Sequence, residues 1–147
     1  METSVTLPFG DGEYKLWLPL PQVFELERSC DTPMLAIEEK LRAAIGAKED
    51  GSFEFVGGGA GLVREIRETI RLGLIGGNCG LVDGEEVEVG PLRAKQLTDL
   101  YAYPARPLSE GVVLAWRLLS AAIFGVELKK KAPPVKPARR RSSAKAK

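Results

Sequence analysis

Histidine is absent from this chain of 147 residues, and cysteine occurs only twice. The absence of histidine removes the commonest general base and metal ligand. Cys30 and Cys79 lie far apart and form no Cys-x-x-Cys motif, so a disulfide is disfavoured if the chain is cytosolic. We expect both thiols to be chemically ordinary, with Cys30 on the apolar side of its own predicted helix and packed in the interior.

Long apolar runs are also missing. The longest run, residues 112–124, is interrupted by Arg117 and is too short to cross a bilayer. Residues 1–5 contain neither the basic segment nor the apolar segment of a secretory signal. We therefore expect a cytoplasmic protein without a membrane partner.

Recognisable catalytic and metal-binding motifs are lacking too. Residues 53–74 superficially suggest a strand, a glycine loop and a helix, the arrangement that holds phosphates. Leu62, however, stands where a dinucleotide fingerprint needs its last glycine, and no Gly-Lys-Ser/Thr follows, which favours a plain connector. The sequence also contains a group of four acidic residues without the order of a calcium loop, which favours a solvated loop over a cation site: Asp83, Glu85, Glu86 and Glu88. We predict a protein that is not an enzyme and binds no cofactor or metal.

The charges that are present are strongly segregated. Residues 129–147 hold nine of the 21 basic residues and none of the 20 acidic ones. The remaining chain holds 12 basic and 20 acidic residues, a formal charge of −8. The basic tail has Val135 as its only branched apolar residue, so we expect it to be disordered. These features predict a folded domain at residues 1–128 and a tail at 129–147.

A hairpin that leads into a helix is the clearest structural pattern. Residues 5–9 and 14–18 alternate apolar and other side chains on either side of a short Gly-Asp-Gly turn. This alternation predicts two antiparallel strands with one buried face. Pro8 cannot donate a ladder hydrogen bond, which places the first strand at an edge.

Helical spacing dominates the rest of the domain. Start signals, apolar stripes and terminal glycines predict helices at residues 22–30, 33–45, 62–74, 91–103 and 109–125. The expected inward residues of the third are Val63, Ile66, Ile70 and Leu74, and those of the fourth are Leu92, Gln96, Leu97 and Leu100. Residues 53–61 are expected to form a loop, with at most a short extended piece, and residues 81–90 an acidic linker. The predicted fold is α+β and mainly α: an N-terminal antiparallel β-hairpin, about five helices and a disordered basic tail.

Two segments could contact partners. The fifth helix is apolar nearly all round, which indicates a central core helix or, less favoured, a surface for a partner or for self-association. The residues of that candidate surface are Val112, Trp116, Leu119, Ile123 and Phe124.

The basic tail is the second segment. It lacks aromatic side chains for base stacking, so it could make only nonspecific electrostatic contacts with nucleic acid or with an acidic protein surface. Its candidate residues are Lys129, Lys130, Lys131, Lys136, Arg139, Arg140 and Arg141. A solubilising extension is the favoured alternative.

Three segments resemble the gene transfer agent family of small phage-like tail proteins, which are grouped with tail assembly chaperones and sometimes labelled as tail tube proteins. The segments are Gly-Glu-Tyr-Lys-Leu-Trp-Leu at 12–18 with Phe-Glu-Leu-Glu at 24–27, Ile-Arg-Glu-Thr-Ile-Arg-Leu-Gly-Leu-Ile-Gly-Gly at 66–77, and Leu-Ser-Ala-Ala-Ile-Phe-Gly at 119–125. The likeness covers residues 5–125. The glycine run at 57–61 and the basic tail depart from the family pattern.

The resemblance implies a noncatalytic role in particle assembly. Tail assembly chaperones bind the tape measure protein, keep its hydrophobic helices from aggregating and help to recruit tail tube subunits. Such a protein acts in the cytoplasm of a bacterial host, whereas a structural component is retained in the virion tail. Tube subunits are usually β-sandwiches, and this sequence predicts too few strands for one. The leading hypothesis is therefore a chaperone, the alternatives being a structural tail component and a small nucleic-acid-associated protein that uses the basic tail.

Overall fold

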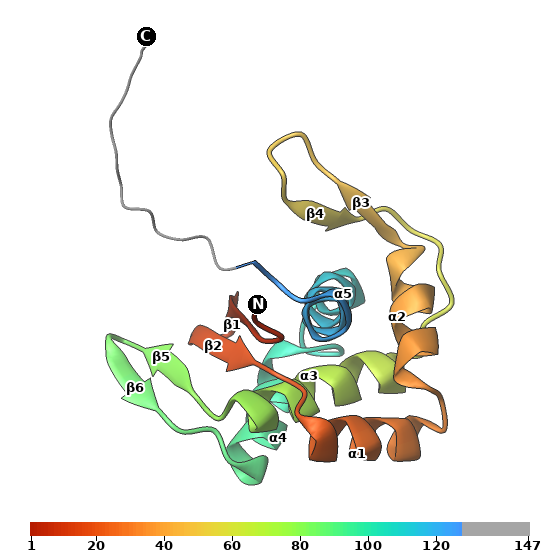
Figure 1. Cartoon of the computed structure of the whole chain (residues 1–147). Helices are drawn as coiled ribbons and strands as arrows, with labels where there is room; N and C mark the ends of the chain where they lie inside the picture. Colours follow the sequence, from red (N-terminus) through yellow and green to blue (C-terminus); the bar gives the residue numbers. More distant parts are fainter. Residues whose placement is uncertain (128–147) are drawn as a thin grey trace, which may run out of the picture.

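The computed structural model describes residues 1–127, which form a mixed α+β fold of five helices and six strands (Figure 1). In chain order the elements are β1 (Val5–Phe9), β2 (Gly12–Leu16), α1 (Leu20–Cys30), α2 (Met34–Arg42), β3 (Ile45–Ala47), β4 (Phe53–Phe55), α3 (Val63–Gly77), β5 (Gly80–Val82), β6 (Glu85–Val87), α4 (Pro91–Tyr101) and α5 (Leu108–Phe124). The predicted fold class is confirmed, including the N-terminal hairpin. The predicted tail lies outside the described residues.

The N-terminal hairpin belongs to a four-stranded antiparallel sheet with strand order β1-β2-β5-β6. Val5 pairs with Leu16 and Phe9 with Gly12, so the alternating apolar residues share one face. β1 is an edge strand, as Pro8 predicted. At the turn, Gly10 has a φ of +60°, and a Cβ there would overlap the ring of Tyr101. Glycine is therefore required on both conformational and steric grounds.

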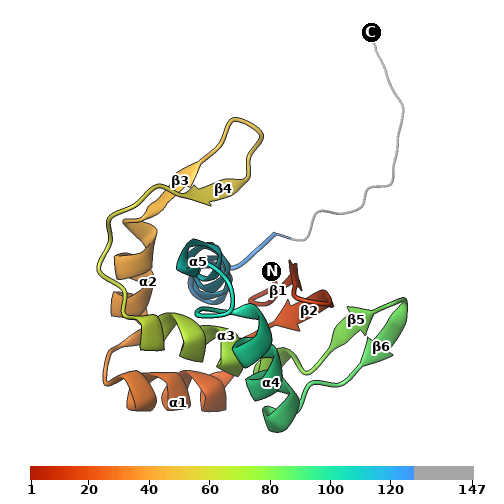
Figure 2. The same cartoon turned by 180° about the vertical axis from the view of Figure 1, so that it is seen from behind.

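Two further hairpins were not predicted. The segment expected to be an acidic linker instead forms β5 and β6. Gly80 pairs with Val87 at one end of this hairpin, and Val82 pairs with Glu85 next to the turn. Asp83 and Gly84 connect them, both with positive φ, as a two-residue hairpin turn requires. β3 and β4 form a separate two-stranded sheet that projects beyond α5 (Figures 1 and 2).

α3 is the central helix, and α1, α4, α5 and β2 pack around it (Figures 1 and 2). Ile66, Ile70 and Leu74 are buried as predicted, whereas Val63 is 39% exposed in the first turn. Three glycines of α3 permit close packing: a Cβ on Gly73 would overlap Leu118, and Cβ atoms on Gly76 and Gly77 would overlap the carbonyl oxygens of Trp17 and Lys15. Gly76 and Gly77 thus allow the end of α3 to pack directly against the backbone of Lys15 in β2 and of Trp17 just after it.

Other sequence expectations need correction. α2 ends at Arg42, and Ile45 belongs to β3 instead of the helix. In α4 the buried residues are Ala94, Leu97 and Thr98, whereas Leu92 and Leu100 are 71% and 58% exposed and Gln96 is also exposed. The Thr98 hydroxyl donates to the Ala94 carbonyl at 2.8 Å, so this polar residue can be buried. Cys30 is buried in the core, as predicted, and Cys79 is exposed.

Candidate functional site

The structure divides the predicted surface of α5 between the core and the exterior. Val112 and Leu119 are 5% and 0% exposed, because α3 and α2 pack against this helix. Trp116 and Ile123 are half-buried, and Phe124 is 61% exposed. The core interpretation of α5 is therefore confirmed for its inner side. Val112 and Leu119 cannot contact a partner in this fold, whereas Trp116, Ile123 and Phe124 remain accessible.

Trp116 connects α5 with two other elements. Its Nε1 donates a hydrogen bond to Oε2 of Glu38 on α2 at 3.2 Å. The Phe53 ring from β4 meets the indole edge-on, with 4.9 Å between ring centroids. Glu38 is 2% exposed and also accepts two 2.9 Å hydrogen bonds from Arg42. The hydrogen bonds from Arg42, together with that from Trp116, lower the pKa of Glu38.

The β3–β4 hairpin adds apolar side chains beside Trp116. Phe53, Phe55 and Val56 are 36%, 40% and 59% exposed. The Val56 N–H donates to the Ala44 carbonyl at 2.8 Å, which fixes the end of the hairpin to the segment after α2. We refer to Phe53, Phe55, Val56 and Trp116 as the α5–hairpin surface. Sequence reasoning missed its hairpin part, although the Phe-Glu-Phe-Val alternation was a weak signal.

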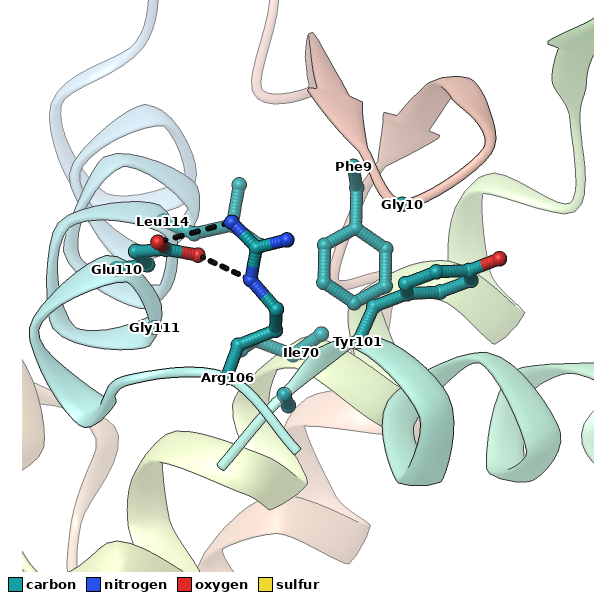
Figure 3. A pocket seen from close by; sticks show the side chains of 9 residues that line it. Phe9, Gly10, Ile70, Tyr101, Arg106, Glu110, Gly111 and Leu114 are labelled. Atoms are coloured by element: carbon teal, nitrogen blue, oxygen red, sulfur yellow. Dashed lines mark hydrogen bonds and ion pairs between the residues drawn. The ribbon is translucent and has the colours of Figure 1, made fainter. Parts of the chain in front are cut away.

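A cleft of about 210 Å³ lies beside the N-terminal part of α5, where the β1–β2 turn meets the C-terminal end of α4 (Figure 3). Its apolar lining includes Phe9, Ile70 and Tyr101, with the rings of Phe9 and Tyr101 edge-on at 6.0 Å. Arg106 and Glu110 lie at the exposed rim and form two hydrogen bonds of 3.2 and 3.1 Å. These bonds raise the pKa of Arg106. Because the two charges satisfy each other, the cleft can hold a small apolar group but presents no free acid or base.

The glycine run does not lead into an anion site. Glu65 is fully buried in the first turn of α3, and its Oε1 accepts the Leu62 N–H at 2.9 Å. Its Oε2 accepts a 2.7 Å hydrogen bond from Lys40. A carboxylate therefore already occupies the N-terminus of α3, where a phosphate would have to bind. The structure thus supports the connector interpretation of residues 57–61.

No protein-family model, curated protein or solved structure matches this chain.

Residues 1–127 contain no group of three or more histidine, cysteine or acidic side chains that could hold a metal ion. Asp83, Glu85 and Glu86 instead lie in the β5–β6 hairpin and Glu88 directly follows it, and all four residues are exposed. None of the helices formed by residues 1–127 combines the length and apolarity that crossing a membrane requires. Lys129, Lys130, Lys131, Lys136 and the three arginines at 139–141 lie outside the described residues.

Proposed function

We propose that this chain is a noncatalytic tail assembly protein of a phage or gene transfer agent, and that it acts as a chaperone for the tape measure protein in the bacterial cytoplasm. The proposal starts from the resemblance of three segments. These segments fall in the β1–β2 hairpin with α1, in α3, and at the end of α5, and the elements of the other two pack against α3. The residues that carry the resemblance therefore build one scaffold.

The observation that supports a binding role is the α5–hairpin surface. Phe53, Phe55, Val56 and Trp116 come from two elements that pack on each other, yet each keeps part of its side chain exposed. Exposed apolar patches on a folded domain commonly mark partner sites. An amphipathic helix of the tape measure protein could lay its apolar side chains there. The net negative charge outside the basic tail would help to keep such a complex in solution.

Co-expression with the tape measure protein of the same genome tests the proposal. We expect the tape measure protein to stay soluble and to co-purify with this chain. Replacing two exposed residues of the α5–hairpin surface, Phe55→Ser with Val56→Ser, is expected to reduce the co-purified amount at least about tenfold, the equivalent of a few apolar contacts. Soluble yield, co-purification and thermal unfolding of the variant alone would be measured.

A matched control is available on α1. Leu20→Ser with Phe24→Ser removes two side chains that are 66% and 62% exposed, away from the α5–hairpin surface. This variant should retain the complex. An insoluble tape measure protein and no complex with the unmodified chain would overturn the chaperone proposal. If both variants lost the co-purified tape measure protein to the same extent, the α5–hairpin surface would be excluded as the binding site.

The strand arrangement supports an assembly role over a tube role. Within residues 1–127 the strands form one four-stranded and one two-stranded sheet, with helices between them, instead of two stacked sheets. Purified particles distinguish the two roles, because an assembly chaperone should be absent from them. Stoichiometric recovery of this chain from intact tails would favour the structural alternative.

A further inference from the structure

The outer face of the four-stranded sheet is exposed and carries acidic side chains. Tyr14 and Leu16 point to the buried side, so their neighbours Glu13 and Lys15 point outward. Glu13 pairs with Leu81, and Leu81 pairs with Glu86, which places these three side chains in one row across β2, β5 and β6. All three residues of the row are exposed, and β6 has a free edge in this sheet.

This part of the sheet has charges without partners among the described residues. Eight of the 12 basic residues outside the tail form ion pairs with acids elsewhere in the domain. None of these pairs involves Glu13 or the four acids of the β5–β6 hairpin. Lys15 is the one basic side chain on the outward positions of the four strands, and it lies over the Trp17 ring. Within residues 1–127, no ion pair brings a cation to the acids of this face.

The chain leaves the described structure beside this same face. Val126 and Glu2 exchange two backbone hydrogen bonds of 2.7 and 3.0 Å. Val126 also lines a shallow groove with Thr6 and Lys15, which are paired neighbours at outward positions of β1 and β2. From Lys15 to Glu86 the path crosses two strand spacings and runs two residues along a strand, roughly 12 Å in all. Nineteen residues can span up to about 63 Å, so residues 129–147 reach β6 easily.

We propose that the basic segment 129–147 binds the outer face and free edge of the sheet at β5–β6 in its own chain. The segment has nine positive charges and no negative ones, whereas the outer face offers Glu13 and Glu86, with Glu88 just after β6. Individual exposed ion pairs are weak. A short tether makes their combined effect substantial, because it holds the segment at a high effective concentration beside the sheet. This inference is independent of the proposed function.

The exposed Cys79, next to β5, allows a direct test in the full chain. A nitroxide label on Cys79 broadens the NMR signals of amides that come close to it, whereas the buried Cys30 should react slowly. We expect strong broadening of the amides of residues 129–147 at about 10 mM salt, and its loss at about 1 M salt, where the screening length falls from roughly 30 to 3 Å.

Two charge-matched triple variants make the test specific. Glu13→Gln with Glu86→Gln and Glu88→Gln should reduce the broadening several-fold. Glu39→Gln with Glu49→Gln and Glu54→Gln removes the same charge from exposed positions on α2, the β3–β4 loop and β4, and should leave the broadening intact.

Three results would overturn the proposal. The first is no broadening at low salt, and the second is an equal reduction in both triple variants. The third is broadening only when a spin-labelled chain is mixed with an isotope-labelled one, which would assign the contact to a second copy.

Discussion

Glu38 shows how one buried carboxylate positions a surface tryptophan. The side chain of Glu38 on α2 is buried between Arg42 and Trp116. Burial of this charge is tolerated because Arg42 donates two hydrogen bonds to the carboxylate and Trp116 donates a third. The indole is thereby held where Phe53 can pack on it.

We predict that Glu38→Gln lowers stability and changes its dependence on pH. Hydrogen bonds from Arg42 and Trp116 place the folded-state pKa of Glu38 below its unfolded value of about 4.3. The carboxylate therefore stabilises the fold fully above that value, and its contribution is lost as the pH falls through the folded-state pKa. We expect Glu38→Gln to cost on the order of 1 kcal/mol at neutral pH. The fall in stability on acidification below about pH 5 should also become shallower. Urea unfolding at a series of pH values measures both effects.

Glu39→Gln is the control for this prediction. Glu39 is the next residue of α2 and has the same charge, but it is exposed. The Glu39→Gln variant should therefore keep a pH dependence of the unfolding free energy close to that of the unmodified chain. An identical pH dependence for the Glu38→Gln variant would contradict the role assigned to this carboxylate.

Among the helices and strands, those with strong local signals were predictable. The N-terminal hairpin and the five helices follow from alternation, from helical apolar spacing and from glycine and proline at the ends of elements. The β5–β6 hairpin was missed although Asp83-Gly84 is a favoured two-residue turn, because its strands have three residues each and many acidic side chains. Its pairing with β2 joins residues about 67 positions apart in sequence, and such contacts leave little local trace.

The candidate site was predictable only in part for a related reason. The nearly uniform apolarity of α5 identified the helix but could not indicate which side the core would take, so Val112 and Leu119 were grouped with Phe124. Likewise, the apolar stripe of α4 favoured Leu92 and Leu100, whereas the structure buries Ala94 and Thr98. Small residues and threonine allow close helix packing, and which side of α4 is buried depends on its contact with α3.

The contact between α3 and the β2 region provides a prediction for a pair of elements. A Cβ on Gly77 would overlap the Lys15 carbonyl oxygen, so α3 and β2 would have to separate to admit a methyl group. We expect Gly77→Ala to lower the free energy of unfolding by about 3 kcal/mol, at the upper end of the usual cost of overpacking, even though alanine favours helices. Chemical denaturation of the purified variant measures this loss.

Gly90→Ala is the control substitution for this contact. Gly90 precedes α4, and a Cβ there would meet no atom within 4 Å. Gly90→Ala should lower the free energy of unfolding by less than about 1 kcal/mol, because alanine is only a poorer N-cap residue than glycine. Equal costs for the two substitutions would show that the α3–β2 approach is not tightly packed.

The molecule as a whole has an uneven distribution of packing. α3 lies inside a shell of helices and β2, with Ile70 and Leu74 fully buried. The β3–β4 hairpin consists of two three-residue strands that project from this body (Figure 1). All three residues of β4 are exposed. A short two-stranded hairpin has little stability of its own, so the proposed partner surface includes the least supported part of the fold.

Amide hydrogen exchange should reveal this distribution. We expect the α3 amides around Ile70 to exchange only through global unfolding, whereas those of β3 and β4 open locally and exchange at least about 10³-fold faster. Mass spectrometry of peptides from the full chain measures both in one sample. Binding of the tape measure protein at the α5–hairpin surface should slow exchange at residues 53–56 and leave the α3 rates little changed. Equal protection of α3 and of β3–β4 in the dilute, unbound chain would contradict this picture. Protection of the hairpin that increased with protein concentration would instead show that a second copy covers Phe53 and Phe55.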